Sequence, residues 1–246
     1  MPEITLILLP GMDGTGELFA PFVQALQVNS RYKNIKTIVV SYPPNEALNY
    51  AQLTKLASAY IPPNKPYILL GESFSGPIAI ALAAKADSHL KGIILSCSFA
   101  RNPKSSLSRL LPVLNFMLPT MPTMPINKLT MPVVKHFLMA NVNNEMVVKI
   151  LFVATQKVLP TVMRARLIAV INVDYTENLA KINVPILYLQ AKNDCLVPAS
   201  AGKYIAENAK NVELVTLNAP HLLLQIVPNE AAKKIQTFIE KTFKDE

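Results

Sequence analysis

The sequence predicts an α/β fold with a mostly parallel sheet of about six strands flanked by helices. The main observation is a series of short apolar runs that alternate with longer helical stretches. The strand candidates are residues 4–9, 36–40, 67–70, 92–96, 185–190 and 212–217. Each is rich in Ile, Val and Leu without alternation, as expected for strands covered on both faces. At 246 residues, the chain is long enough for a single domain, 1–246, with a sizeable core.

The first strand candidate, residues 4–9, leads into the glycine-rich loop Pro10 to Gly16. Three glycines within six residues allow this loop to aim a backbone amide inward. A phosphate-binding turn is the alternative interpretation. It is the weaker one, because the spacing does not match G-x-G-x-x-G and no G-K-[ST] follows.

The third strand candidate leads into Gly71-Glu-Ser-Phe-Ser-Gly76, and a small-residue helix is expected from Pro77 to Lys85. A serine at the apex of such a strand–turn–helix unit is typical of a nucleophile elbow, which lifts the hydroxyl clear of the sheet. Small neighbours are required because strand and helix approach closely. The motif departs from G-x-S-x-G at Ser75, which is itself small. An ordinary Gly/Ser turn is the alternative.

Two polar loops follow the last two strand candidates, and they contain Asp194 and His221. The chain has only three histidines. His89 precedes a strand and is expected at the opposite end of the sheet, and His136 lies in a Pro/Met-rich middle segment. Only His221 therefore follows a strand, at the end of the sheet where the elbow serine is expected.

Together, these motifs resemble the α/β-hydrolase superfamily of serine esterases, lipases and thioesterases. The resemblance covers roughly residues 4–100 and 182–244 and implies the α/β-hydrolase fold, with the acid and the histidine following the serine in the chain. Carried over residue by residue, it implies Ser73 as nucleophile, Asp194 as acid, His221 as base, and the backbone N–H groups of Met12 and Phe74 as oxyanion hole. A serine at the elbow favours acyl transfer, and no metal or cofactor is required.

The segment at about 101–180 is expected to form a helical cap over the serine, between core parts at about 1–100 and 181–246. Residues 133–141 and 144–158 have the pattern of amphipathic helices. The stretch Leu118 to Pro125 cannot be helical, because proline recurs at every third position. The last helix is expected at about 229–243, with Asn229 as its cap and an apolar face toward the core.

The cap holds seven of the nine methionines: Met117, Met121, Met124, Met131, Met139, Met146 and Met163. Flexible thioether side chains form an adaptable apolar lining that suits an acyl chain. The alternative is that they pack the cap onto the core. Both interpretations can hold for different methionines.

The cap also carries +6 of the net charge of +8. It contains nine basic residues and only three acidic ones. The basic residues are Arg101, Lys104, Arg109, Lys128, Lys135, Lys149, Lys157, Arg164 and Arg166. A basic rim would favour an acidic carrier protein, a coenzyme A thioester or an anionic lipid. A solvated surface without a partner is the alternative. Nucleic acid is not expected, because no binding motif or aromatic run accompanies the charge.

Two cysteines, Cys97 and Cys195, indicate no disulfide framework, and Cys195 is expected to be a buried bystander. No signal peptide or membrane-length apolar run is evident, so a cytoplasmic location is expected. We therefore expect a serine hydrolase that cleaves a carboxylic ester or thioester. The alternatives are an acyltransferase or C–C hydrolase with the same triad, or a non-catalytic ligand-binding protein on a hydrolase fold.

Overall fold

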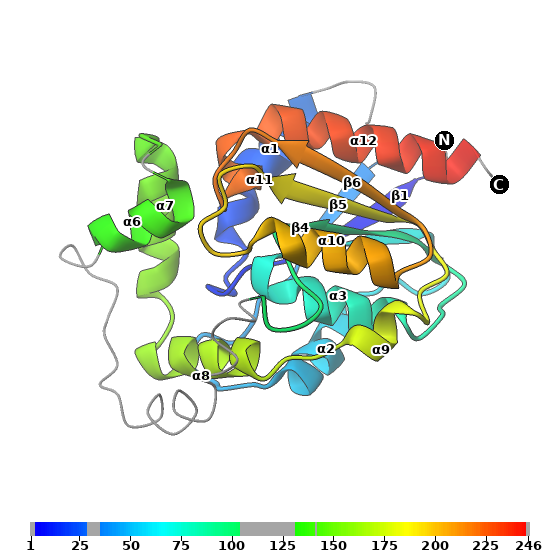
Figure 1. Cartoon of the computed structure of the whole chain (residues 1–246), viewed down its shortest axis with the longest axis horizontal. Helices are drawn as coiled ribbons and strands as arrows, with labels where there is room; N and C mark the ends of the chain where they lie inside the picture. Colours follow the sequence, from blue (N-terminus) through cyan, green and yellow to red (C-terminus); the bar gives the residue numbers. More distant parts are fainter. Residues whose placement is uncertain (1–2, 29–34, 104–130, 141, 245–246) are drawn as a thin grey trace.

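A computed structural model of the chain describes residues 3–28, 35–103, 131–140 and 142–244 (Figure 1). At its centre is a six-stranded sheet in the order β2-β1-β3-β4-β5-β6, and every neighbouring pair is parallel. The strands are β1 (Ile4–Leu9), β2 (Ile35–Val39), β3 (Tyr67–Glu72), β4 (Leu90–Ser96), β5 (Ile186–Ala191) and β6 (Val212–Leu217). The predicted α/β fold with a parallel sheet is confirmed.

The predicted strands agree with the observed ones to within two residues at each end. The expectation that every strand is covered on both faces is correct for β1 and β3, whose residues are all buried. It is wrong for β2 and β6, which carry exposed residues along their length. These two strands form the edges of the sheet, where each has only one neighbour.

Helices cover both faces of the sheet and bury alternate residues of its central strands (Figure 1). Ile7 and Leu9 of β1 face one apolar cluster, whereas Leu6 and Leu8 face the other. The first face is covered by α2 (Tyr50–Ser58), α3 (Gly76–Ala83), α9 (Thr176–Leu179) and α10 (Ala199–Asn208). The second is covered by α1 (Ala20–Val28), α11 (Leu223–Ile226) and α12 (Pro228–Lys244).

The last helix, α12, begins one residue earlier than expected, so the assignment of Asn229 as its cap is wrong. Pro228 can occupy the first helical position because no intrahelical donor is needed there. The expected apolar face is confirmed: Ala231, Ile235 and Phe238 are buried.

The segment expected to form the cap contains, among its described residues, α6 (Met131–Met139), α7 (Glu145–Gln156) and α8 (Pro160–Ile171), followed by the short α9. A small apolar cluster joins α6 and α7 to the core through Leu18, in the short helix η1 (Glu17–Phe19), and Leu222. The Pro-rich stretch Leu118 to Pro125 lies outside the described residues. So do Met117, Met121, Met124, Lys104, Arg109 and Lys128.

Within the described ranges, no single helix is long and apolar enough to cross a membrane. Helices α7 and α8 meet the length and composition only as a pair, bent by 101°.

The sheet order creates a switch point between β1 and β3. From β1 the chain runs outward to β2, whereas from β3 it continues in the opposite direction to β4, β5 and β6. Ligand sites in open α/β sheets form beyond the carboxyl ends of the strands at such a point. The glycine-rich loop and the elbow serine follow β1 and β3, so the fold brings both to this position.

Candidate active site

Ser73 occupies a tight turn between β3 and α3, the first residue of the short helix η3 (Ser73–Ser75). Its φ of 47° is unfavourable for a residue with a side chain and holds the serine at the apex of the turn. A Cβ added at Gly71 would lie 2.7 Å from the Ser75 carbonyl oxygen, and one at Gly76 would lie 1.8 Å from Ser98 Oγ. The expected need for small neighbours is therefore confirmed.

Ser75, where the motif departs from glycine, is fully buried and faces the glycine-rich loop. Its hydroxyl donates to the Pro10 carbonyl and lies 2.7 Å from the Tyr42 hydroxyl. Burial raises the pKa of Tyr42, so this phenol stays protonated and can donate to Ser75. A serine in place of the usual glycine at position 75 thus supplies a hydrogen bond between the elbow and the loop after β1.

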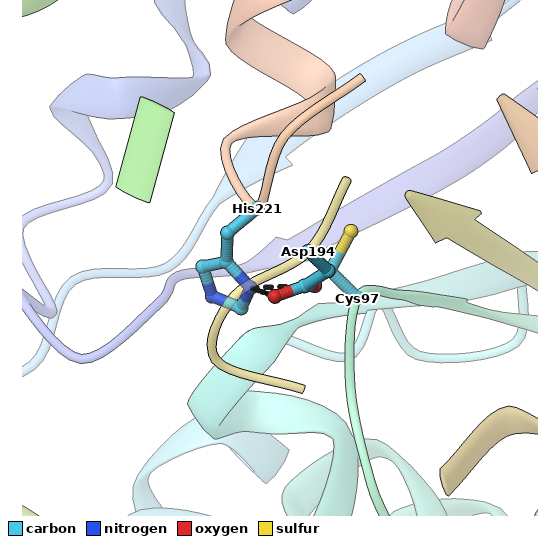
Figure 2. A group of neighbouring side chains, drawn as sticks. All are labelled: Cys97, Asp194 and His221. Atoms are coloured by element: carbon cyan, nitrogen blue, oxygen red, sulfur yellow. Dashed lines mark hydrogen bonds and ion pairs between the residues drawn. The ribbon is translucent and has the colours of Figure 1, made fainter. Parts of the chain in front are cut away.

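Side chains from three loops meet in a chain of hydrogen bonds. Ser73 Oγ lies 2.9 Å from His221 Nε2, and His221 Nδ1 lies 2.8 Å and 3.0 Å from the two carboxylate oxygens of Asp194. Figure 2 shows the contact between His221 and Asp194. Both of these side chains are 4% exposed. With Nδ1–H donated to Asp194, Nε2 can accept the proton of the Ser73 hydroxyl.

Asp194 is held in place from two sides. Its Oδ1 accepts the backbone N–H groups of Leu196 and Val197, each at 2.8 Å. Burial alone would raise the pKa of Asp194, but the hydrogen bond and charge of His221 and these two amides outweigh it. The pKa therefore lies below its ordinary value, and the carboxylate stays ionised at neutral pH.

Met12 lies in the loop after β1 and lines the same cavity as Ser73 and His221. The Gly14 N–H donates to the Gly11 carbonyl at 3.0 Å. Because the peptide unit is planar and trans, the Met12 N–H points away from that carbonyl. Phe74 follows the serine, its ring stacked on Tyr50 with centroids 4.8 Å apart, so the backbone around both candidate oxyanion amides is held.

The cavity at the serine has a volume of about 150 Å³ and mostly apolar walls. The core and the cap both contribute to them: Leu18, Leu196 and Leu222 from the core, and Val134, Leu138, Leu151 and Met163 from the cap.

The described cap methionines divide between the two interpretations of the sequence. Met163 lines the cavity. Met139 is buried in the contact between cap and core, and Met146 is 55% exposed. A lining role therefore holds for Met163, and a packing role holds for Met139 and for the partly buried Met131.

Glu72 is a site residue to which the sequence analysis assigned no role. It is buried, lines the cavity, and accepts a hydrogen bond of 2.9 Å from Gln225 Nε2. Burial raises its pKa from 4.5 to about 7; the Gln225 bond lowers it, nearby Asp13 raises it, and His221 lowers it. The signal available in the sequence was an acidic residue between an apolar strand and the elbow serine.

Cys97 lies beside the candidate acid and base. Its sulfur and ligand atoms of Asp194 and His221 lie within 4.8 Å of one another (Figure 2). Burial raises the pKa of Cys97 well above its ordinary value, so the group is a neutral thiol, which is a poor nucleophile and metal ligand. Asp194 and His221 are also bonded to each other, so the cluster does not resemble a metal site.

Three other sequence expectations can be judged from the structure. Cys195, expected to be buried, is exposed, because Asp194 turns inward and the next side chain turns outward. His89 precedes β4, and its carbonyl accepts the N–H of Tyr67 at the start of β3, so it lies at the opposite end of the sheet as expected. His136 is exposed on α6.

One of the basic residues expected at the rim of the cap, Arg166, is not on the surface. Arg166 is only 1% exposed and donates to backbone carbonyls of the core, so it is not a surface charge. Lys157 pairs with Glu17, and Arg101 lies over the Tyr204 ring at 3.6 Å.

Comparison with known proteins identifies relatives on both sequence and fold. The sequence model of the family described as "Serine aminopeptidase, S33" matches residues 49–224. Phytyl ester synthase 1, chloroplastic, of Arabidopsis thaliana is 38% identical over 114 residues, which are 45% of this chain and only 16% of the plant protein.

Among solved structures, an esterase from Exiguobacterium antarcticum superposes with a TM-score of 0.79 at 14% identity, covering 97% of this chain and 92% of that one. A lipase-esterase related protein from Clostridium acetobutylicum has a TM-score of 0.73 at 18% identity, covering 96% and 95%. A bromoperoxidase from Bacillus anthracis has a TM-score of 0.76 at 15% identity, covering 98% and 92%. At these identities, the structures establish the fold alone.

Proposed function

Because this chain belongs to the serine aminopeptidase S33 family of α/β hydrolases, we propose that it is a serine hydrolase that cleaves a carboxylic ester or thioester. The observation that carries the proposal is the hydrogen-bonded series from Ser73 through His221 to Asp194. Its nucleophilic end lines an apolar cavity.

In the proposed mechanism, His221 Nε2 takes the hydroxyl proton of Ser73 while Ser73 Oγ attacks the carbonyl carbon. Asp194 holds the imidazole in the correct tautomer and stabilises its charged form. The N–H groups of Met12 and Phe74 stabilise the negative oxygen of the tetrahedral intermediate. The leaving alcohol or thiol departs with the proton held by His221. A water molecule, deprotonated by His221, then attacks the acyl carbon. The bond to Ser73 Oγ breaks, His221 returns the proton to this oxygen, and the acid is released.

We propose an apolar acyl group as the part of the substrate that fills the cavity. Leucine, valine and methionine side chains form most of the walls, and they favour a hydrocarbon chain over a polar group. Because Val134, Leu138 and Met163 belong to the cap, the cap would contribute to the choice of acyl chain.

An acidic carrier protein, a coenzyme A thioester or an anionic lipid remains our proposal for the rest of the substrate. The described lysines of the cap support it, and we refer to them as the cap lysines: Lys135, Lys149 and Lys157.

Ester synthesis by acyl transfer to an alcohol is the second candidate function. It is supported by the similarity of 114 residues to a plant protein named as a phytyl ester synthase. The same acyl-enzyme would serve, with an alcohol in place of water as the attacking group.

The decisive experiment combines active-site labelling with a substrate series. A fluorophosphonate should label Ser73 and not the buried Ser75, as mapped by mass spectrometry. p-Nitrophenyl esters of graded acyl length and acyl thioesters should then be turned over by the wild type and not by Ser73→Ala. His221→Ala should lower kcat by several orders of magnitude. His136→Ala, at an exposed histidine, should leave kcat nearly unchanged.

An adduct on Ser75, or turnover that survives Ser73→Ala, would contradict the proposal. To separate the two functions, long-chain alcohols are added and the products are identified by mass spectrometry. Free acid as the dominant product supports hydrolysis. Ester as the dominant product at low alcohol concentration supports acyl transfer.

A further inference from the structure

Arg166 is a buried cation on α8 of the cap. It is 1% exposed, and among the described residues it is the only lysine or arginine that is buried. Burying a guanidinium is unfavourable unless hydrogen-bond acceptors replace water, so its partners indicate its role.

Its partners are backbone carbonyls of the loop after β1 and of a neighbouring segment. Nη1 donates to the Met12 carbonyl at 2.9 Å and to the Asp13 carbonyl at 2.8 Å, and Nη2 donates to the Pro43 carbonyl at 3.0 Å. The planar guanidinium can serve all three acceptors at once, which an ammonium group on a flexible stem cannot do as well.

Gly14 is matched to this arginine. Its φ of 71° favours glycine, and an added Cβ would lie 2.5 Å from Arg166 Nη1. The guanidinium therefore packs directly against the loop backbone, and any side chain at position 14 would displace it.

Five consecutive carbonyls of this loop, from Pro10 to Gly14, have a hydrogen-bond donor. Ser75 serves the first, the Gly14 N–H serves that of Gly11, and the Tyr42 N–H serves that of Gly14 at 2.7 Å. Arg166 serves the two that remain, and it is the only one of these donors that belongs to the cap. Without it, the peptide units on the carboxyl side of Met12 would lose their fixed orientation.

We propose that Arg166 is a positioning residue: it holds the backbone of Met12 and Asp13 so that the Met12 N–H stays directed at the oxyanion formed on Ser73. This inference rests on the proposed function, because it concerns the oxyanion of the same acyl transfer. It also makes the chemical step depend on the contact between cap and core, since the donor lies on α8 and two of its three acceptors lie in the loop after β1.

The test compares Arg166→Ala with Arg164→Ala, which removes the same charge from the same helix. On the best ester substrate, Arg166→Ala should lower kcat about 100-fold, as expected for the loss of one oxyanion donor, with KM nearly unchanged. Arg164→Ala should keep kcat close to the wild-type value.

Two inhibitors distinguish positioning from general damage. A trifluoromethyl ketone with the substrate's acyl chain forms a tetrahedral oxyanion on the serine, so Arg166→Ala should weaken its binding by the same factor as kcat. A non-reactive alcohol with the same chain only fills the cavity, so its affinity should not change. Equal losses for both inhibitors, or a wild-type kcat in Arg166→Ala, would overturn the inference.

If Arg166→Ala does not fold, as judged by circular dichroism, Arg166→Lys provides the same test. Lysine keeps the charge but not the fork of donors, so kcat and ketone affinity should fall together by at least about tenfold. Wild-type values for a folded Arg166→Lys would overturn the inference as well. Failure of the proposed function itself has a different signature: the wild type would show no turnover that depends on Ser73.

Discussion

Replacing Glu72 by glutamine should stabilise the protein at neutral and alkaline pH. Burial raises the pKa of this carboxyl from 4.5 to about 7 in the folded chain. Between these pH values, the folded chain holds a proton that the unfolded chain has released, so wild-type stability falls as the pH rises. The stabilisation by this proton is complete below pH 4.5 and lost above pH 7, a difference of about 3 kcal/mol in the free energy of unfolding.

Glu72→Gln removes this dependence because glutamine carries no titrating proton. The new amide has partners on the same neighbour: its oxygen can accept from Gln225 Nε2, and its NH₂ can donate to Gln225 Oε1. That oxygen is buried and has no hydrogen-bond partner among the described residues. The variant should therefore keep the fold and its packing.

Urea unfolding at pH 5, 6, 7 and 8 measures the effect. The variant should gain stability over the wild type progressively with pH, with most of the roughly 3 kcal/mol appearing between pH 5 and pH 7. Glu46→Gln, which makes the same substitution at an exposed glutamate, is the matched control. A difference between wild type and Glu72→Gln that does not change with pH would refute the reasoning.

Three further predictions concern the elbow, the triad and the cap. Asp194→Asn should lower kcat about 10⁴-fold, because Oδ1 is occupied by two backbone amides and the new NH₂ would face Nδ1 of His221 and favour the wrong tautomer; a loss below tenfold in stopped-flow acylation would argue against the assignment. Gly76→Ala should lower the free energy of unfolding, measured in urea, by at least about 1–3 kcal/mol, because the new methyl group would lie 1.8 Å from Ser98 Oγ. Gly11→Ala is the control and should be nearly neutral, because its methyl group would lie 3.6 Å from the nearest atom, Asp13 Oδ1. Replacing the cap lysines by glutamine should flatten the salt dependence of kcat/KM for an acyl-coenzyme A but not for a neutral ester; equal salt slopes in the wild type would show that the cap charge has no steering role.

Local patterns were enough to predict the strands of the sheet and the candidate site residues that follow the carboxyl ends of these strands. The strand candidates matched because buried parallel strands are short runs of branched apolar residues. The two glycines beside Ser73 could be anticipated because close packing of strand and helix leaves no room for a side chain. Helix α8 was not singled out, because its apolar residues lie on all sides rather than along one stripe.

The role of several polar residues depended on neighbours distant in the chain. Arg166 counts as a surface charge in any composition analysis, and only its position against Met12 and Asp13 makes it a buried donor. Glu72 has a pKa of about 7 because the fold buries it, and this effect outweighs the hydrogen bond from Gln225, which lowers the pKa. Cys195 was expected to be buried, but the direction of the turn after Asp194 exposes it.

The sequence by itself therefore predicted the fold class and the candidate elbow, because each depends on residues within a few positions of one another. The tertiary structure decided which long-range contacts form: the 2.9 Å approach of Ser73 to His221, the pKa of Glu72, and the contact of Arg166 with the loop after β1. These depend on distances and burial between segments up to 154 residues apart, and such quantities are set by packing of the whole chain rather than by any local pattern.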